Sequence, residues 1–136
     1  MLSFALLGCG RIAKRHSELL GNSEIDGAQL VAVCDKKTGR AKKIGEQFSV
    51  PWFEDMHEMM QTSQPDVVVV LTESGLHAQH VVELAPYGSH ILVEKPMALT
   101  LVDADRMIQA CDRAGSKLFV IKQNRFNVPI VKTRQA

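Results

Sequence analysis

The apolar run at residues 67–71 constrains the fold of this chain more than any other segment. Every residue in it is Val or Leu, so the polar alternation of a half-exposed strand is missing. A strand that is apolar on both faces needs helices on both faces, as in buried parallel sheets. The run therefore predicts a central strand of a parallel sheet. No apolar run in the chain approaches the roughly 20 residues that span a membrane.

Strand-like and helix-like segments alternate along the rest of the chain. Short apolar or β-branched runs predict further strands at residues 3–7, 29–34, 52–53, 90–93 and 117–121. Between the strands, apolar residues recur at helical spacing, and Ser74 and Thr100 are the expected N-caps of the last two helices. This alternation predicts right-handed βαβ crossovers. We therefore expect an α/β Rossmann fold, with a doubly wound, mostly parallel six-stranded sheet and helices on both faces.

Composition argues against several classes of partner. Sixteen Lys and Arg against fifteen Asp and Glu leave a formal charge of +1 over 136 residues, so no bulk attraction favours nucleic acid or an anionic membrane. The three cysteines are widely separated and form no Cys-x-x-Cys pair, which fits a reducing compartment. We therefore expect a cytoplasmic protein of one compact unit, with no nucleic-acid and no membrane partner.

A glycine turn joins the first predicted strand to the first predicted helix. Residues 8–13 read Gly-Cys-Gly-Arg-Ile-Ala, the G-x-G-x-x-A spacing of dinucleotide-binding turns. Gly8 would permit the tight turn, and Gly10 would let the backbone approach a pyrophosphate. The phosphates would bind the free N–H groups where the helix begins, near Ile12. Arg11 would either contact phosphate or be a solvated arginine at the start of the helix. For the whole motif, the alternative is an ordinary structural turn that binds no nucleotide.

Asp35 ends the second predicted strand, 25 residues after Gly10. At this distance a carboxylate is expected to meet the ribose hydroxyls of adenosine. The carboxylate would accept two hydrogen bonds from the ribose and repel a 2′-phosphate, which favours NAD over NADP as the cofactor. Lys36 and Lys37 partly offset that repulsion. The alternative for Asp35 is a turn residue that starts the next helix.

Polar residues follow the two strands expected near the centre of the sheet, where open α/β sheets bind ligands. Thr72 and His77 follow residues 67–71, and Glu94, Lys95 and Pro96 follow residues 90–93. Lys95 is the candidate for chemistry, because an ammonium beside a reacting alcohol can stabilise the developing alkoxide and help to relay its proton. The alternative is a surface lysine paired with Glu94.

With these motifs in this order, the chain resembles the Gfo/Idh/MocA oxidoreductases, and Glu94-Lys95-Pro96 is the most specific element of the resemblance. The resemblance implies NAD-dependent hydride transfer between a sugar or nucleotide-sugar hydroxyl and nicotinamide. It implies that Lys95 is the active-site lysine, in contact with substrate and cofactor. It also implies that Pro96 follows in a cis or tightly constrained turn, and that Glu94 lines the nicotinamide side.

The same resemblance implies a division of the protein. Residues 1–122 would form the NAD(P)-binding Rossmann domain, and residues 123–136 would begin the connection to a C-terminal α/β substrate domain that this chain lacks. That second domain would make the homo-oligomer contacts. The isolated chain is therefore expected to bind cofactor without efficient turnover.

Two segments, residues 71–77 and 121–129, are similar to family members that oxidise C3 of UDP-N-acetylglucosamine derivatives in lipopolysaccharide biosynthesis. Glu73-Ser74 departs from the Pro-Asn or Pro-Ser that is usual after the threonine. In this comparison Asn124 and Arg125 would bind the anionic groups of the substrate, or else hold the two domains together. A non-catalytic NAD(H)-binding module that senses redox state remains the alternative function.

Overall fold

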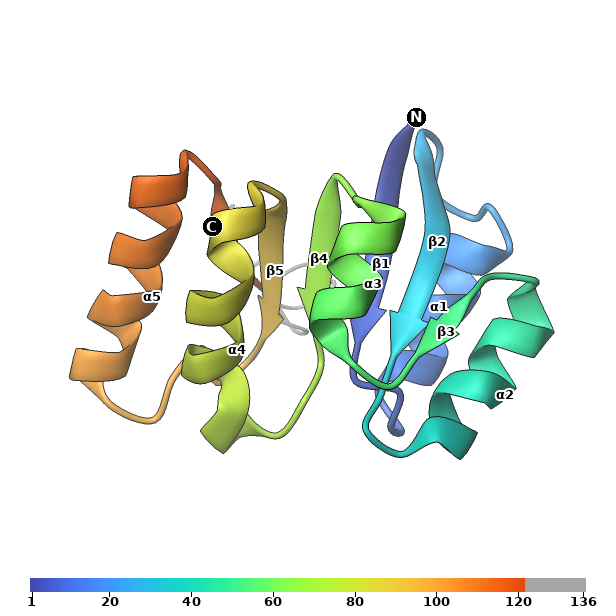
Figure 1. Ribbon diagram of the computed structural model, residues 1–136, viewed down its shortest axis with the longest axis horizontal. Helices are drawn as coiled ribbons and strands as arrows, with labels where there is room; N and C mark the ends of the chain where they lie inside the picture. The colour runs from blue at the N-terminus through green and yellow to red at the C-terminus, as the bar shows by residue number, and fades with distance from the viewer. Residues whose placement is uncertain (122–136) are drawn as a thin grey trace, which may run out of the picture.

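Six parallel strands form the sheet at the centre of the computed structural model, which describes residues 1–121 (Figure 1). The sheet order is β3-β2-β1-β4-β5-β6, and every neighbouring pair is parallel. The order reverses between β1 and β4, which confirms the doubly wound Rossmann fold. The strands are β1 (Leu2–Leu7), β2 (Ala28–Cys34), β3 (Trp52–Phe53), β4 (Val67–Val70), β5 (His90–Glu94) and β6 (Leu118–Ile121).

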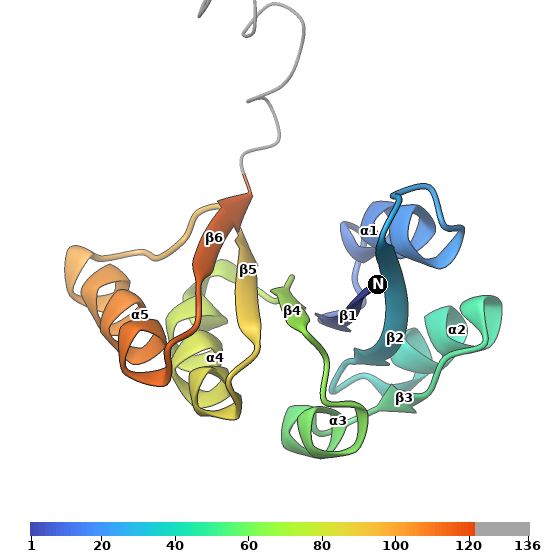
Figure 2. The ribbon, with the colours of Figure 1, turned by 90° about the horizontal axis from the view of Figure 1, so that it is seen from above.

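Helices cover both faces of the sheet (Figure 2). On one face lie α1 (Ala13–Gly21) and α2 (Thr38–Phe48). On the other lie α3 (Met56–Ser63), α4 (His77–Leu84) and α5 (Leu101–Ala114). Within the described residues, none of the helices combines the length and the apolar character needed to cross a membrane.

The structure shows why β4 is apolar at every position. Val68 and Val70 belong to the core cluster under α3, α4 and α5, whereas Val69 belongs to the cluster under α1 and α2. Successive side chains of a strand point to opposite faces, so a strand covered on both sides must be apolar throughout. β4 has β1 and β5 as its neighbours, which confirms the predicted central position.

The predicted start of α4 was wrong and that of α5 was right. Ser74–Leu76 form a 3-10 turn, closed by a 2.9 Å hydrogen bond from the Leu76 N–H to the Glu73 carbonyl. This turn delays the α-helix to His77, and Ser74 makes no capping hydrogen bond. Thr100 does cap α5, since its Oγ1 accepts from the Asp103 N–H at 3.1 Å.

Met107 on α5 provides a test of how this helix packs on the sheet. Its side chain is fully buried, whereas that of the next residue, Ile108, is 46% exposed. Met107→Ala should lower the free energy of unfolding by about 2–5 kcal/mol, because a cavity remains in the core. Ile108→Ala is the matched control and should change it by no more than about 1 kcal/mol. Urea denaturation measures both, and equal losses would contradict the buried face assigned to α5.

Candidate functional site

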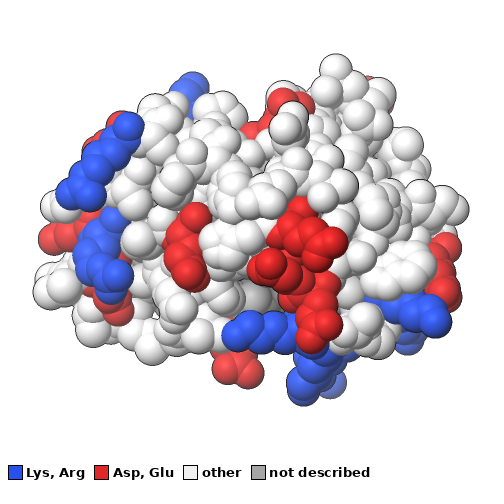
Figure 3. Space-filling model, viewed as in Figure 1, with Lys and Arg blue, Asp and Glu red and all other residues white. Residues whose placement is uncertain are grey.

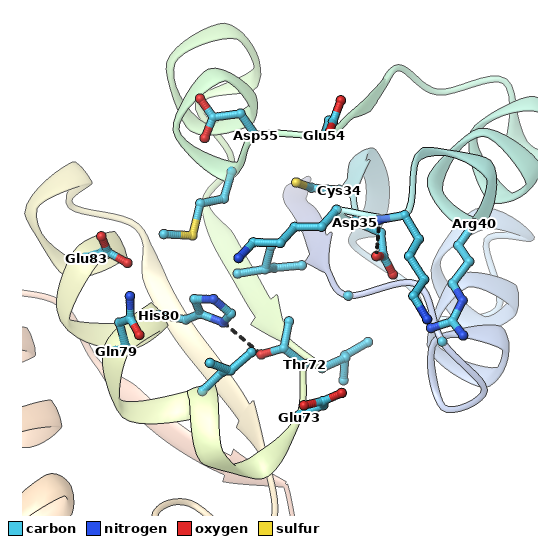
Figure 4. Close-up of a pocket in the computed structure, with 18 of the residues that line it drawn as sticks. Cys34, Asp35, Arg40, Glu54, Asp55, Thr72, Glu73, Gln79, His80 and Glu83 are labelled. Carbon is cyan, nitrogen blue, oxygen red and sulfur yellow. Dashed lines mark hydrogen bonds between the residues drawn. The ribbon is translucent and has the colours of Figure 1, made fainter.

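A cavity of about 620 Å³ opens where β1, β2 and β4 end (Figure 4). Its lining includes the residues at or just beyond the carboxyl ends of these strands: Leu7, Gly8, Cys34, Asp35, Leu71 and Thr72. This edge contains the point where the strand order reverses, and open α/β sheets bind their ligands there. Asp35 and Arg40 lie on one side of the cavity, and His80 and Glu83 lie on the other.

Gly8 occupies a position that only glycine fits. Its φ is +102°, and a Cβ would lie 2.8 Å from the backbone carbonyl carbon of Leu71. Residues with a Cβ are strained at such a positive φ. The Gly8 N–H donates to the carbonyl of Cys34 at 2.8 Å. Gly8 therefore makes the tight turn expected of it and brings the ends of three strands together.

Gly10 leaves open space beside the start of α1. A Cβ at this position would meet only Nη1 of Arg40, at 3.7 Å, so the fold itself does not require glycine here. The backbone N–H groups of Gly10, Arg11 and Ile12 have no hydrogen-bond partner among residues 1–121. The N-cap Ile12 supplies no capping side chain. Free donors at the positive end of a helix dipole can bind an anion.

The Asp35 carboxylate connects the glycine turn to the segment after β2. Its Oδ2 accepts from the Cys9 N–H at 2.9 Å, and its Oδ1 accepts from the Lys37 N–H at 2.8 Å. Each carboxylate oxygen can accept a further hydrogen bond. Asp35 can thus hold the turn and still bind hydroxyl groups in the cavity. Sequence spacing did not reveal this cross-link, which joins residues 26 positions apart.

Three cations line the cavity, and one of them, Lys36, is close enough to His80 of the opposite wall to lower its pKa. Lys36 and Lys37 follow Asp35 directly, and Arg40 comes from the first turn of α2. Arg40 was not predicted from the sequence. Lys36 and Lys37 precede α2, so helical spacing gave no signal for this residue.

His77 does not face the cavity as the sequence led us to expect. Its ring is only 1% exposed, with Nδ1 2.9 Å from the Pro96 carbonyl oxygen and Nε2 2.8 Å from the Thr72 carbonyl oxygen. These two carbonyls belong to the segments that follow β4 and β5. His77 is buried and therefore connects the segment after β4 to the segment after β5 from inside the fold.

His80 lines the cavity, which was not predicted from the sequence. The residue is 7% exposed, and its Nδ1 lies 2.8 Å from Oγ1 of Thr72. Burial lowers the pKa of His80 below its ordinary value, although the nearby Glu83 carboxylate opposes the shift. The imidazole is therefore neutral near pH 7 and has one donor and one acceptor nitrogen.

The cysteines near the turn are poor nucleophiles. Burial, with a contribution from the Asp35 carboxylate, raises the pKa of Cys9 and of Cys34 to about 12. The thiolate is the reactive form of cysteine, and a pKa this high leaves almost none of it near neutral pH. The chemistry of the site therefore has to come from other residues.

The Glu94-Lys95-Pro96 segment lies at the end of β5, outside the lining of this cavity. The Lys95–Pro96 peptide bond is cis, and Lys95 is exposed. Glu94 is 6% exposed, with Oε2 3.4 Å from Nε2 of His16. The geometry of that pair is not that of a hydrogen bond, and neither Glu94 oxygen has a hydrogen-bond partner among the described residues. Asn124 and Arg125 lie outside the described residues.

Comparison with known proteins places this site in a family. Residues 2–122 match the model of the Gfo/Idh/MocA oxidoreductase family, NAD-binding Rossmann fold. The chain is 36% identical over 127 residues to the D-apiose dehydrogenase of Paraburkholderia graminis, covering 93% of this chain and 33% of that protein. It is 32% identical over 136 residues to the myo-inositol 2-dehydrogenase of Thermotoga maritima, covering 99% of this chain and 40% of that protein.

A solved structure supports the same assignment. The WlbA dehydrogenase of Bordetella pertussis, crystallised with NADH and UDP-GlcNAcA, matches with a TM-score of 0.93 at 37% identity. The match covers 99% of this chain and 41% of that one, so the chain spans less than half the length of these relatives. The chain belongs to the Gfo/Idh/MocA oxidoreductase family, and its described residues form the NAD-binding Rossmann fold of that family.

Proposed function

We propose that the chain binds NAD(H) in the cavity at the ends of β1, β2 and β4. The observation that carries this proposal is that Gly10 and Asp35 line one cavity, and that the N–H groups of Gly10, Arg11 and Ile12 at the start of α1 have no partner among the described residues. The pyrophosphate would bind these amides and the start of α1, and Asp35 would accept from the ribose hydroxyls. The open space at Gly10 fits a closely approaching phosphate.

We further propose that the protein is a dehydrogenase of a sugar or nucleotide-sugar CH–OH group. Bound NAD⁺ would supply a nicotinamide carbon that accepts hydride. Lys95 would hydrogen-bond the reacting oxygen, stabilise the alkoxide that develops as hydride leaves, and help to relay the hydroxyl proton to solvent or to a base of the substrate-binding part. Glu94 and Pro96 would border the nicotinamide, and His77 would fix the Pro96 segment against Thr72. Thr72 lines the cofactor cavity, so this link would position Lys95 relative to the cofactor.

The proposed substrate is a UDP-N-acetylhexosamine derivative oxidised at C3, as in lipopolysaccharide biosynthesis. The likeness of residues 71–77 and 121–129 to that subgroup supports it, together with 37% identity to a protein crystallised with UDP-GlcNAcA. Relatives named for D-apiose and for myo-inositol have similar identity. A free polyol or sugar is therefore the competing substrate class.

We also propose that residues 1–122 are the cofactor-binding domain and that residues 123–136 lead into a second, substrate-binding domain. The relatives support this division, since the chain spans only 33% to 41% of their length. Asn124 and Arg125 would then bind the anionic groups of the substrate. Assembly into a homo-oligomer would depend on that second domain, in a cytoplasmic enzyme.

Gly10→Val tests the phosphate site. A side chain here would occupy the path of the pyrophosphate, so NADH affinity should fall by at least about 100-fold, which is roughly 2.8 kcal/mol. The fold should persist, because only the Arg40 side chain lies within 4 Å of the new Cβ. Gly39→Val is the matched control at an open position on α2. Calorimetric titration measures both, and a Gly10→Val protein that binds NADH normally would refute the phosphate site.

Asp35→Asn tests the ribose site. Asn keeps one acceptor oxygen for the turn but loses the second acceptor and the charge, so NADH binding should weaken by about tenfold more than NADPH binding. Lys36, Lys37 and Arg40 would remain to attract the 2′-phosphate. The ratio of the two dissociation constants, measured by fluorescence titration, should shift toward NADPH by about tenfold or more. A ratio that does not move would show that Asp35 does not face the ribose.

Lys95→Ala tests the catalytic assignment in a protein that carries the substrate-binding part. Lys95 is exposed and lies outside the cofactor cavity, so the variant should bind NADH within about threefold of wild type. Turnover should fall by about 10²- to 10⁴-fold, because the developing alkoxide loses the group that stabilises it and helps to relay its proton. Stopped-flow absorbance of reduced nicotinamide follows the reaction. Unchanged turnover would remove Lys95 from the mechanism.

A further inference from the structure

The cavity has a second wall, opposite Asp35. Neither the proposed phosphate site nor the proposed ribose site uses this wall. Gln79, His80 and Glu83 of α4 form this wall (Figure 4). Met56 and Leu76 add apolar side chains to the lining of the cavity. Apolar surface with a few placed polar groups is typical of a pocket for a flat ring. A dinucleotide whose ribose binds Asp35 has its purine base free to reach this wall.

His80 is the buried polar group of the second wall. It is 7% exposed, and its Nδ1 is held by Oγ1 of Thr72 at 2.8 Å. The ring has no other hydrogen bond within residues 1–121, and it points into the cavity in Figure 4. Nε2 is therefore available to a ligand. When the Thr72 hydroxyl donates to Nδ1, Nε2 carries the proton of the neutral ring and donates.

Glu83 presents the complementary group one turn along α4. Its side chain is 41% exposed, and Oε1 lies 4.0 Å from Nε2 of His57. The His57 ring is itself held by the Tyr87 hydroxyl, 2.6 Å from Nδ1. An ionised carboxylate only accepts hydrogen bonds. Figure 3 shows acidic side chains over both α3 and α4 on this face, with basic side chains beside them. Lys36 also lines the cavity, but the Glu83 carboxylate affects the pKa of His80 more than the Lys36 ammonium does.

We propose that Glu83 and His80 recognise the base of the dinucleotide and select adenine over a 6-oxopurine. This inference rests on the proposed binding of NAD(H). Adenine has an amino donor at C6 beside an acceptor at N1, which matches the Glu83 carboxylate and the donating Nε2 of His80. Hypoxanthine has an oxygen acceptor at C6 beside a donor at N1. Its C6 oxygen would face the Glu83 carboxylate, acceptor against acceptor, and its N1–H would face the donating Nε2 of His80, donor against donor. Glu83 is the specificity residue, because His80 can change its tautomer whereas a carboxylate cannot donate.

The experiment compares NADH with reduced nicotinamide hypoxanthine dinucleotide, which differs from NADH only in the purine. Calorimetric titration of the protein should give a dissociation constant at least about tenfold higher for the hypoxanthine dinucleotide, because its C6 oxygen would face the Glu83 carboxylate, which only accepts. In Glu83→Gln the ratio of the two constants should fall to about twofold or less, since an amide can donate or accept by rotating.

Glu58→Gln is the matched control. Glu58 is an exposed carboxylate on the neighbouring helix α3, and it does not line the cavity. This variant should keep the wild-type ratio, which separates a direct contact from a general effect of negative charge. The exposure of Glu83 makes misfolding of its variant a minor concern, and circular dichroism verifies the fold.

The outcomes distinguish this inference from the proposed function. Tight binding of NADH with equal affinity for the hypoxanthine dinucleotide would overturn the base recognition alone. A ratio that stays high in Glu83→Gln, or that falls equally in Glu58→Gln, would overturn the role of Glu83. Failure of the folded protein to bind either dinucleotide would overturn the proposed cofactor site, and base recognition with it.

Discussion

The hydrogen bond from the Cys9 N–H to the Asp35 carboxylate is the contact on which the site depends. It holds the glycine turn after β1 against the end of β2. Gly8, packed on the backbone of Leu71, brings the end of β4 to the same place. With the turn held on both sides, the N–H groups at the start of α1 remain without partners among the described residues. One acidic residue thus shapes the anion site and also borders the cavity as a hydrogen-bond acceptor.

The rest of the fold provides a rigid edge for these contacts. The apolar valines of β4 fill the cores on both sides of the sheet, so the polar groups that follow the strand are confined to its carboxyl end. There, His77 joins the Thr72 segment to Pro96, and His80 fixes the Thr72 side chain. Two histidines of one short helix therefore order both segments that border the proposed cofactor. Substitutions of buried residues that support these two segments are expected to weaken binding by displacing the groups that contact the ligand.

Local patterns predicted the fold well and the site only in part. The strand and helix periods, the Thr100 cap and the glycine spacing all depend on neighbours in sequence, and the structure agrees with them. Ser74 failed as a cap because a 3-10 turn was as compatible with the same residues as a helix start. The contacts of His77, His80 and Arg40 depend on which segments meet at the sheet edge. Such contacts depend on how chain segments fold back on one another, and spacing along the chain does not encode them.

The most direct test of the phosphate site is nuclear magnetic resonance of the ¹⁵N-labelled protein during titration with NADH. The backbone amide resonances of Gly10, Arg11 and Ile12 should shift strongly and their hydrogen exchange should slow, because each N–H gains a phosphate oxygen as acceptor. The amide resonance of Gly88, which lies in the turn before β5 and so at the end where that strand begins, should not change. Saturable binding of NADH that leaves the three turn amides unshifted would contradict the phosphate site.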